Sequence, residues 1–238
     1  MTRWFKRPSA SSSAAAGSRP QPLLPADAEP GPIAVGAADG AADPTALAFA
    51  DIVTELINRH LMLGRRGLVL CGASMGTGVS FTAANLSATL AYTGVQTLLI
   101  EADLRAPTQA AAFDLGAGEP GLLQYLTADA DRADIVTLDV LPNLSVVLAG
   151  GTAPDADDLL AGDRFRNLVR DCMRDYGCVI VDTPPANRFA DVRTVAAAVG
   201  YAVIVGRNDF TYLDDVQLLS EQLNQVGVAV VGSIFNAG

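Results

Sequence analysis

The sequence predicts an α/β fold with three layers, in which helices cover both faces of a mostly parallel central sheet. From about residue 67 onward, short runs rich in leucine and β-branched residues alternate with longer amphipathic segments, and this alternation is typical of β-α-β units. Half of the 238 residues are hydrophobic and only 18% are charged, a composition that suits a sheet buried on both faces. The length corresponds to one folded domain.

The N-terminal segment, residues 1–43, differs in composition from the rest of the chain. It consists mainly of Ala, Ser, Gly and Pro, so it cannot bury enough apolar surface to offset the entropy lost on ordering. We expect a disordered arm at residues 1–43 and one domain at residues 44–238. The start of the arm is compatible with contact to an anionic membrane surface or with a solvated chain end, because it combines Arg3, Trp4, Phe5, Lys6 and Arg7.

Hydrophobic periodicity places the individual elements. Apolar residues recur at helical intervals from Ala46 to Leu63, after a helix-start signal at Asp43 and Pro44. The predicted strands are Gly67–Cys71, Thr97–Glu101, Leu144–Leu148, Cys178–Asp182, Ala202–Val205 and Val228–Ile234. The further predicted helices are Ser80–Tyr92, Pro107–Phe113, Leu122–Leu126, Asp163–Asp175, Asp191–Ala198 and Leu213–Val226.

Charge and single residue types exclude several kinds of partner and site. The formal net charge is −10, which argues against a nucleic-acid partner because phosphate backbones are bound by clustered Lys and Arg. Cys71, Cys172 and Cys178 show no CxxC spacing, so we predict neither a disulfide framework nor a zinc site, and a reducing cytoplasm. No apolar run approaches the roughly 20 residues that span a bilayer. The only histidine, His60, is expected to be solvated at a helix end.

A glycine-rich turn joins the first predicted strand to the next helix, in the order of a P-loop. Its glycines permit backbone conformations in which successive N–H groups point at phosphate oxygens. Ser80 stands where a P-loop serine offers its hydroxyl to Mg²⁺. The alternative is a tight turn without a ligand. The expected phosphate cradle is Gly76, Thr77, Gly78, Val79, Ser80 and Phe81.

Val79 occupies the position of the P-loop lysine, whose ammonium group reaches the β- and γ-phosphates. A charge-assisted hydrogen bond contributes about 1.5–3 kcal/mol, so its absence is expected to weaken nucleotide binding about tenfold to a hundredfold. The expected loss in rate is on the order of 10²–10³. Binding of a nucleotide is therefore expected to survive better than catalysis.

Carboxylates end two other predicted strands. Glu101 and Asp103 lie two residues apart, which places them on the same side of an extended chain, and Asp182 ends the strand Cys178–Asp182. The C-terminal ends of parallel strands meet at one edge of a sheet, so we expect these carboxylates beside the glycine-rich turn. There they are placed to hold Mg²⁺ or its waters and to accept a proton from an attacking hydroxyl.

Together these segments resemble the bacterial tyrosine kinases of capsule and exopolysaccharide synthesis, relatives of the MinD and ParA ATPases. The resemblance extends over about residues 46–236. Ser74 to Ser80 falls in register with the family's P-loop. Leu98 to Pro107 matches Leu-Leu-Ile-Asp-Ala-Asp-Leu-Arg-x-Pro, with Glu101 in place of the first aspartate, and Val179 to Pro185 matches Val-Ile-Ile-Asp-Thr-Pro-Pro.

The resemblance implies a P-loop NTPase fold that binds ATP or ADP with Mg²⁺. It implies that Ser80, Asp103 and Asp182 hold Mg²⁺ or its waters and that Asp103 is the catalytic acceptor, with Asp182 and Glu101 as further catalytic candidates. It also implies a membrane polysaccharide co-polymerase (Wzz-like) as partner and a cytoplasmic location, peripheral to the inner membrane through that partner. The family forms homo-oligomeric rings, but the leading helix lacks the family's Glu-x-x-Arg-x-x-Arg spacing.

Three functions follow from this reading. The first is a regulatory pseudokinase of exopolysaccharide biosynthesis and export, in which a bound nucleotide shifts a conformational equilibrium without being hydrolysed. The second is an active ATP-dependent protein-tyrosine autokinase or ATPase, in which Arg105 or Arg207 compensates for the missing lysine. The third is a positioning ATPase like MinD or ParA, which would require a further lysine early in the turn.

Overall fold

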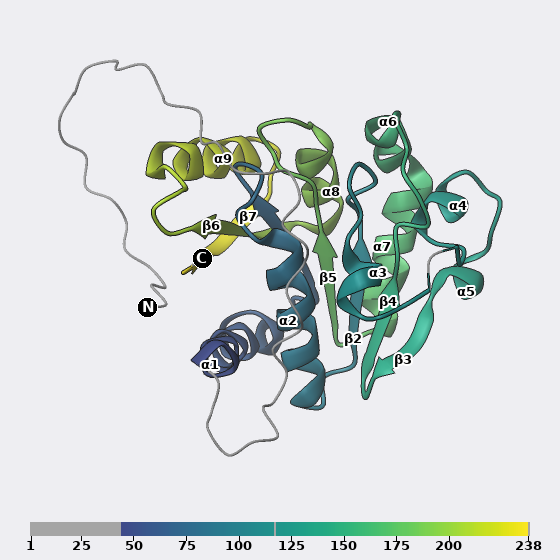
Figure 1. The fold of residues 1–238 in the computed structure, drawn as a ribbon, viewed down its shortest axis with the longest axis horizontal. Helices are drawn as coiled ribbons and strands as arrows, with labels where there is room; N and C mark the ends of the chain where they lie inside the picture. The colour runs from purple at the N-terminus through teal and green to yellow at the C-terminus, as the bar shows by residue number, and fades with distance from the viewer. Residues whose placement is uncertain (1–43, 117, 238) are drawn as a thin grey trace.

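The computed structural model describes residues 44–116 and 118–237, so the predicted arm at residues 1–43 lies outside the described residues. The strands are β1 (Gly67–Gly72), β2 (Thr97–Glu101), β3 (Thr137–Leu141), β4 (Leu144–Val147), β5 (Cys178–Asp182), β6 (Tyr201–Arg207) and β7 (Ala229–Asn236). They form a seven-stranded sheet in the order β3-β4-β2-β5-β1-β6-β7 (Figure 1). Neighbouring strands are parallel except β3, which runs antiparallel to β4.

Helices connect the strands and cover the sheet. One face is covered by α1 (Pro44–Arg59) and α2 (Val79–Tyr92). Helix α1 continues into the short 3-10 helix η1 (Leu61–Leu63). The remaining helices are α3 (Gln109–Ala112), α4 (Leu122–Leu126), α5 (Arg132–Ile135), α6 (Ala156–Ala161), α7 (Asp163–Asp175), α8 (Asp191–Val199) and α9 (Leu213–Gln225).

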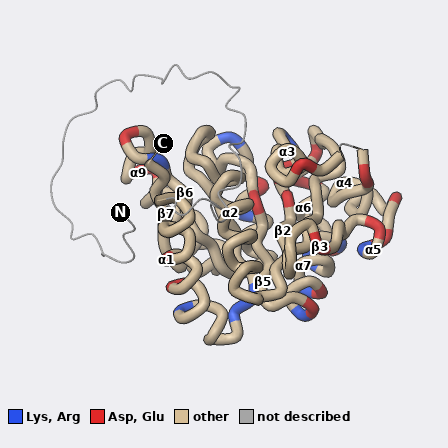
Figure 2. Tube along the Cα trace, turned by 60° about the horizontal axis from the view of Figure 1, so that its bottom comes forward, with Lys and Arg blue, Asp and Glu red and all other residues tan. Residues whose placement is uncertain are grey.

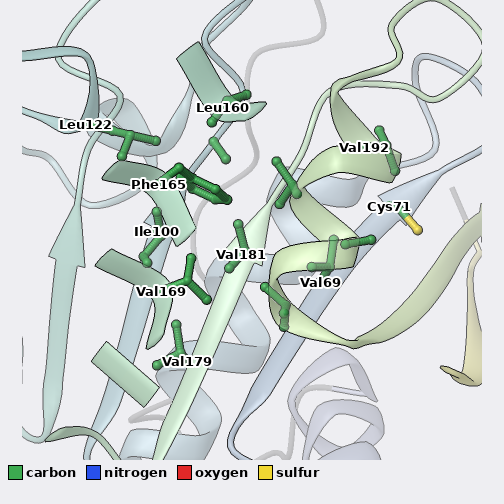
Figure 3. Packing of buried hydrophobic residues seen from close by; sticks show 14 of the residues in the cluster. Val69, Cys71, Ile100, Leu122, Leu160, Phe165, Val169, Val179, Val181 and Val192 are labelled. Carbon is green, nitrogen blue, oxygen red and sulfur yellow. The ribbon is translucent and has the colours of Figure 1, made fainter. Parts of the chain in front are cut away.

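Two clusters of buried hydrophobic residues separate the three layers. On one face, α1 and α2 pack on alternate side chains of the central strands, such as Leu68 and Leu70 of β1. On the opposite face, Val69 and Val181 pack against α7 and α8. Figure 3 shows Phe165 of α7 among these buried side chains. Because β1, β2 and β5 are buried at every position, the sheet is covered on both faces as parallel sheets require.

The predicted α/β fold with a mostly parallel sheet is confirmed, and each predicted strand and helix forms with small shifts at its ends. The sequence interpretation missed β3, α5 and α6. β3 is an edge strand with a partly exposed pattern, and its register is interrupted around Asp139, which has a positive φ of 52°. Short elements of this kind carry too few residues for periodicity to reveal them.

The prediction that His60 is solvated is wrong. The side chain is 2% exposed, its Nε2 lies 3.0 Å from the backbone oxygen of Gly67, and its ring meets Tyr201 edge-on at 4.9 Å. After α1 the chain tightens into η1 and reverses at Gly64, whose φ is 75°, and this turn brings His60 over the start of β1. Burial lowers the pKa of His60.

The three cysteines Cys71, Cys172 and Cys178 are buried free thiols. Burial raises the pKa of Cys71 and of Cys178 to about 12. Within residues 44–116 and 118–237, no helix is both long enough and apolar enough to cross a membrane.

Candidate functional site

The glycine-rich turn between β1 and α2 lies at the edge of the sheet where the parallel strands end. Gly76 and Gly78 have φ angles of 76° and 81°, a left-handed conformation that glycine adopts at low cost. The turn leads into α2, a helix of 14 residues. Because the first N–H groups of a helix have no carbonyl partner within it, the turn ends at a site that favours an anion.

A side chain from the far edge of the sheet supports this turn. Asn236, the last residue of β7, donates through Nδ2 to the backbone oxygen of Thr77 at 2.7 Å. The same nitrogen lies 3.4 Å from Thr82 Oγ1, and a Cβ atom added to Gly78 would collide with it. Glycine at position 78 therefore provides the positive φ angle and leaves room for the Asn236 amide against the turn.

The predicted cradle contributes backbone at several of its positions. Val79 is partly buried and packs against the hydrophobic cluster of α1 and α2. The side chain of Thr77 turns back to donate to the Ser74 carbonyl at 3.2 Å, and the Phe81 ring lies against Phe49 with centroids 6.2 Å apart. The turn thus offers N–H groups and the Ser80 hydroxyl, but none of the described residues is a lysine.

Asp182 ends β5 beside the first turn of α2 and is fully buried. Its Oδ2 accepts a hydrogen bond of 2.6 Å from Gln109 Nε2. Its Oδ1 is buried and has no hydrogen-bond partner among the described residues. Burial raises the pKa of Asp182 to about 7, against the lowering effect of the hydrogen bonds from Gln109 and Ser80.

Glu101 is the register partner of Asp182 across β2 and β5, and it is 1% exposed. Its Oε1 accepts hydrogen bonds from the backbone N–H groups of Thr108 and Gln109 at 2.5 and 2.7 Å. Its Oε2 accepts from the N–H of Ala149 at 2.9 Å. Burial raises the pKa of Glu101, and these three bonds oppose the rise. The structure thus ties the Glu101 carboxylate to the backbone before α3 and after β4.

Asp103 follows β2 at the same edge and is 7% exposed. Its Oδ1 accepts hydrogen bonds from the backbone N–H groups of Arg105 and Ala106, both at 2.9 Å. Burial raises the pKa of Asp103, and these two bonds oppose the rise. Figure 2 shows acidic residues where β2 leads toward α3.

The Arg105 side chain is engaged by residues outside the glycine-rich turn. Its Nε pairs with the buried carboxylate of Asp191 at 3.2 Å. Its Nη2 pairs with Asp157 at 3.1 Å, and its Nη1 donates to the carbonyl of Pro154 at 2.6 Å. The guanidinium also stacks over the Phe189 ring, 4.8 Å from the centroid. All three guanidinium nitrogens are therefore engaged at the start of α8 and in the segment that contains α6.

The chemistry of these groups suits a nucleotide phosphate with a divalent cation. The left-handed glycines and the N-terminus of α2 suit the phosphate. The unpartnered Oδ1 of Asp182 and the Ser80 hydroxyl beside it are oxygen donors, the type that Mg²⁺ prefers. The fold and this arrangement define a P-loop NTPase.

Comparison with known proteins identifies the family. A family model described as an AAA domain matches residues 71–230. The chain is 31% identical over 169 residues to the tyrosine-protein kinase CpsD of Streptococcus agalactiae, covering 71% of this chain and 74% of CpsD. It is 32% identical over 195 residues to EpsB of Ralstonia solanacearum, covering 82% of this chain and 26% of EpsB. The chain belongs to the bacterial tyrosine kinase family of P-loop domains, and it spans about a quarter of the length of EpsB.

Solved structures give the same result. The kinase domain of the Escherichia coli tyrosine kinase ETK superposes with a TM-score of 0.78 at 29% identity, covering 83% of this chain and 77% of that domain. The chimerical protein CapA2B2 superposes with a TM-score of 0.74 at 27% identity, covering 82% of this chain and 86% of the chimera. MinD of Pyrococcus horikoshii, solved with Mg-ADP, shares the fold with a TM-score of 0.64 at 19% identity.

Sequence reasoning left two side chains of this edge out of the site. Gln109 was placed inside a predicted helix without a role, although it is a polar residue before an apolar run from Ala110 to Phe113. Asn236 was included only as the end of the family resemblance and was not assigned to the turn. Its partner, Thr77, lies 159 residues earlier, so only the parallel pairing of the strands brings the two together.

Proposed function

We propose that this chain is a regulatory pseudokinase of exopolysaccharide biosynthesis and export, whose P-loop binds ATP or ADP with Mg²⁺ but turns the nucleotide over slowly or not at all. The observation that carries the proposal is Val79, an apolar residue at the start of α2 that packs toward the core. Lys6 is the only lysine of the chain. The anion site of the turn is then formed by backbone dipoles alone, which bind a phosphate more weakly than dipoles and an ammonium together.

In this proposal the acidic residues retain their positions. Ser80 and Asp182 hold Mg²⁺ or its waters, Asp103 completes the acidic edge, and the backbone from Gly76 to Phe81 cradles the phosphates. When bound, Mg²⁺ neutralises charge on the phosphates. Glu101 supports the backbone around the site through three hydrogen bonds rather than by contact with the nucleotide.

We also propose that the domain acts in the cytoplasm together with a membrane polysaccharide co-polymerase, and that this partner holds it at the inner membrane. The similarity to the chimerical protein CapA2B2 supports a partner of this kind. A ligand that binds one conformation of the domain more tightly shifts the population toward that conformation without being hydrolysed, and this is the regulatory step that the site retains.

A calorimetric titration of the purified protein with Mg-ATP and Mg-ADP, together with an assay of phosphate release, tests the proposal. We expect measurable binding of both nucleotides and no phosphate release above the spontaneous rate. Phosphate release at the rate of an active kinase would replace this proposal by the active-enzyme alternative. Absence of binding would leave a scaffold that has only the fold of the family.

One observation favours the active enzyme as a second candidate. Arg207 ends β6 at the same edge, with its guanidinium 5.9 Å from the centroid of Phe210. A Cβ atom at Gly76 would lie 3.9 Å from the Phe210 ring, so the ring that Arg207 contacts borders the turn. If Arg207 replaces the lysine, Arg207→Gln will weaken Mg-ADP binding about tenfold or more in the same titration, whereas the exposed control Arg170→Gln will leave it unchanged.

A further inference from the structure

Gln109 is a polar side chain in a position that packing alone would give to an apolar residue. It is fully buried at the first position of α3. The residues that follow it, Ala110 and Phe113, pack against the hydrophobic cluster of α1 and α2. Its own Oε1 is buried and has no hydrogen-bond partner among the described residues. An unpaired buried acceptor costs free energy, so another advantage must account for a carboxamide here.

That advantage is visible in the two hydrogen bonds that the Gln109 nitrogen donates. Nε2 lies 2.6 Å from Asp182 Oδ2 and 3.1 Å from the backbone oxygen of Ser80. The orientation of the amide is fixed by chemistry, since the backbone carbonyl of Ser80 only accepts hydrogen bonds and the amide nitrogen must therefore face it. One side chain therefore links the end of β5 to the first turn of α2, the two elements that carry the oxygen donors of the site.

The consequence for Asp182 is that its two oxygens become different. Oδ2 is occupied by Gln109, whereas Oδ1 is buried without a hydrogen-bond partner. A buried carboxylate oxygen in this condition requires a proton, a hydrogen-bond donor or a cation. Since Gln109 occupies Oδ2, Oδ1 is the oxygen left for the cation or one of its waters, and the Ser80 hydroxyl is a second oxygen donor beside the same carboxylate.

We propose that Gln109 is a positioning residue of the cation site: it holds Asp182 through Oδ2 and thereby directs Oδ1 to the divalent cation that accompanies the nucleotide. This inference deepens the proposed function and rests on it, because the cation serves the phosphates of the P-loop. Gln109 acts through Asp182 and does not itself contact the nucleotide. Groups that orient metal ligands in this way typically contribute about tenfold to a hundredfold to metal affinity.

The test uses Mn²⁺ as the probe, because its electron paramagnetic resonance signal reports the free ion directly. Mn²⁺ is titrated into the full chain without nucleotide and with ADP. Gln109→Met keeps the length of the side chain and removes the donor, and we expect it to weaken Mn²⁺ binding about tenfold or more. Gln217→Met, on the exposed face of α9, is the matched control and should bind Mn²⁺ like the wild type.

A double-mutant cycle separates positioning from mere support of the fold. In the Asp182→Asn background, Gln109→Met should have no further effect on Mn²⁺ affinity, because the residue through which it acts has lost its charge. If Gln109 only stabilised the fold, Gln109→Met would lower the unfolding midpoint, but its effect would not depend on Asp182. If Gln109→Met does not fold, Gln109→Asn replaces it, since the shorter amide cannot reach both acceptors.

Three results would overturn the inference: no Mn²⁺ binding by the wild type with or without ADP, equal Mn²⁺ affinity of the wild type and Gln109→Met, or an undiminished effect in the Asp182→Asn background. Failure of the proposed function looks different. If ADP does not bind but Mn²⁺ affinity depends on Gln109 through Asp182, the positioning role stands and the nucleotide-sensing role is lost. If ADP binds and Mn²⁺ affinity does not depend on Gln109, the nucleotide-sensing role stands and the positioning role is lost.

Discussion

At the scale of single residues, Glu101 stands where the family motif has its first aspartate, and its longer side chain changes what the carboxylate contacts. The extra methylene lets the carboxylate reach backbone N–H groups on two separate segments, those of Thr108, Gln109 and Ala149. The sequence placed a carboxylate at the correct strand end. It could not show where that carboxylate points, because Ala149 lies 48 residues away in the chain.

Glu101→Asp restores the family residue and is nevertheless expected to destabilise the domain. The shorter side chain cannot accept all three bonds, so at least one buried N–H group loses its partner at a cost of about 1–3 kcal/mol. Urea denaturation monitored by circular dichroism measures the change. Glu221→Asp, on the exposed surface of α9, is the control and should unfold like the wild type. Equal or greater stability of Glu101→Asp would show that the three bonds contribute little.

The buried carboxylate of Asp182 predicts an unusual dependence of stability on pH. Its pKa is raised from 3.8 to about 7, so between these values the folded protein holds a proton that the unfolded chain has released. The free energy of unfolding therefore falls as the pH rises through this window, by up to about 1.4 kcal/mol per pH unit. The raised pKa values of Glu101 and Asp103 act in the same direction, and the lowered pKa of His60 acts in the opposite one.

Asp182→Asn isolates this contribution. The unfolding midpoint of the variant should rise relative to that of the wild type as the pH increases from about 5 to about 8, because the variant has no buried charge to form. Thermal denaturation of both proteins in the same buffers measures the difference. Parallel midpoints across this range would mean that Asp182 titrates near its ordinary value and that its environment is better solvated than the structure indicates.

At the scale of elements, the parallel sheet explains both what periodicity found and what it missed. The central strands are buried at every position and were predicted nearly residue by residue, because apolar runs bounded by turn signals mark them clearly. The edge strand β3 was not predicted, because its register is interrupted around Asp139. The turn after α1 was not predicted either, because η1 reverses the chain after His60. Contacts between distant elements, such as that of Asn236 with Thr77, have no local signal.

Asn236→Ala tests whether β7 holds the glycine-rich turn in its binding conformation. Without the 2.7 Å bond to Thr77, the turn must be ordered when the phosphate binds, and we expect Mg-ADP affinity to fall about fivefold. Calorimetric titration measures the change, and Asn224→Ala at the end of α9 is the control. An unchanged affinity for Asn236→Ala would show that the glycine φ angles alone define the turn.

At the scale of the whole molecule, the fold brings every candidate group to one edge of the sheet. The glycine-rich turn follows β1, the carboxylates lie at the ends of β2 and β5, and Arg207 and Asn236 end β6 and β7. Membership of the bacterial tyrosine kinase family agrees with this arrangement. We propose that the domain keeps the nucleotide site of a kinase and lacks one charge within it.

The most direct measurement of that claim is a calorimetric titration of Val79→Lys with Mg-ADP beside the wild type. An intact pocket that lacks only the ammonium group should gain about tenfold to a hundredfold in affinity. Val226→Lys, at the exposed end of α9, adds the same charge elsewhere and should gain nothing. The account is contradicted if Val79→Lys binds Mg-ADP no more tightly than the wild type, or if Val226→Lys gains as much affinity. In either case the nucleotide site itself has changed, and the absence of the lysine does not account for its affinity.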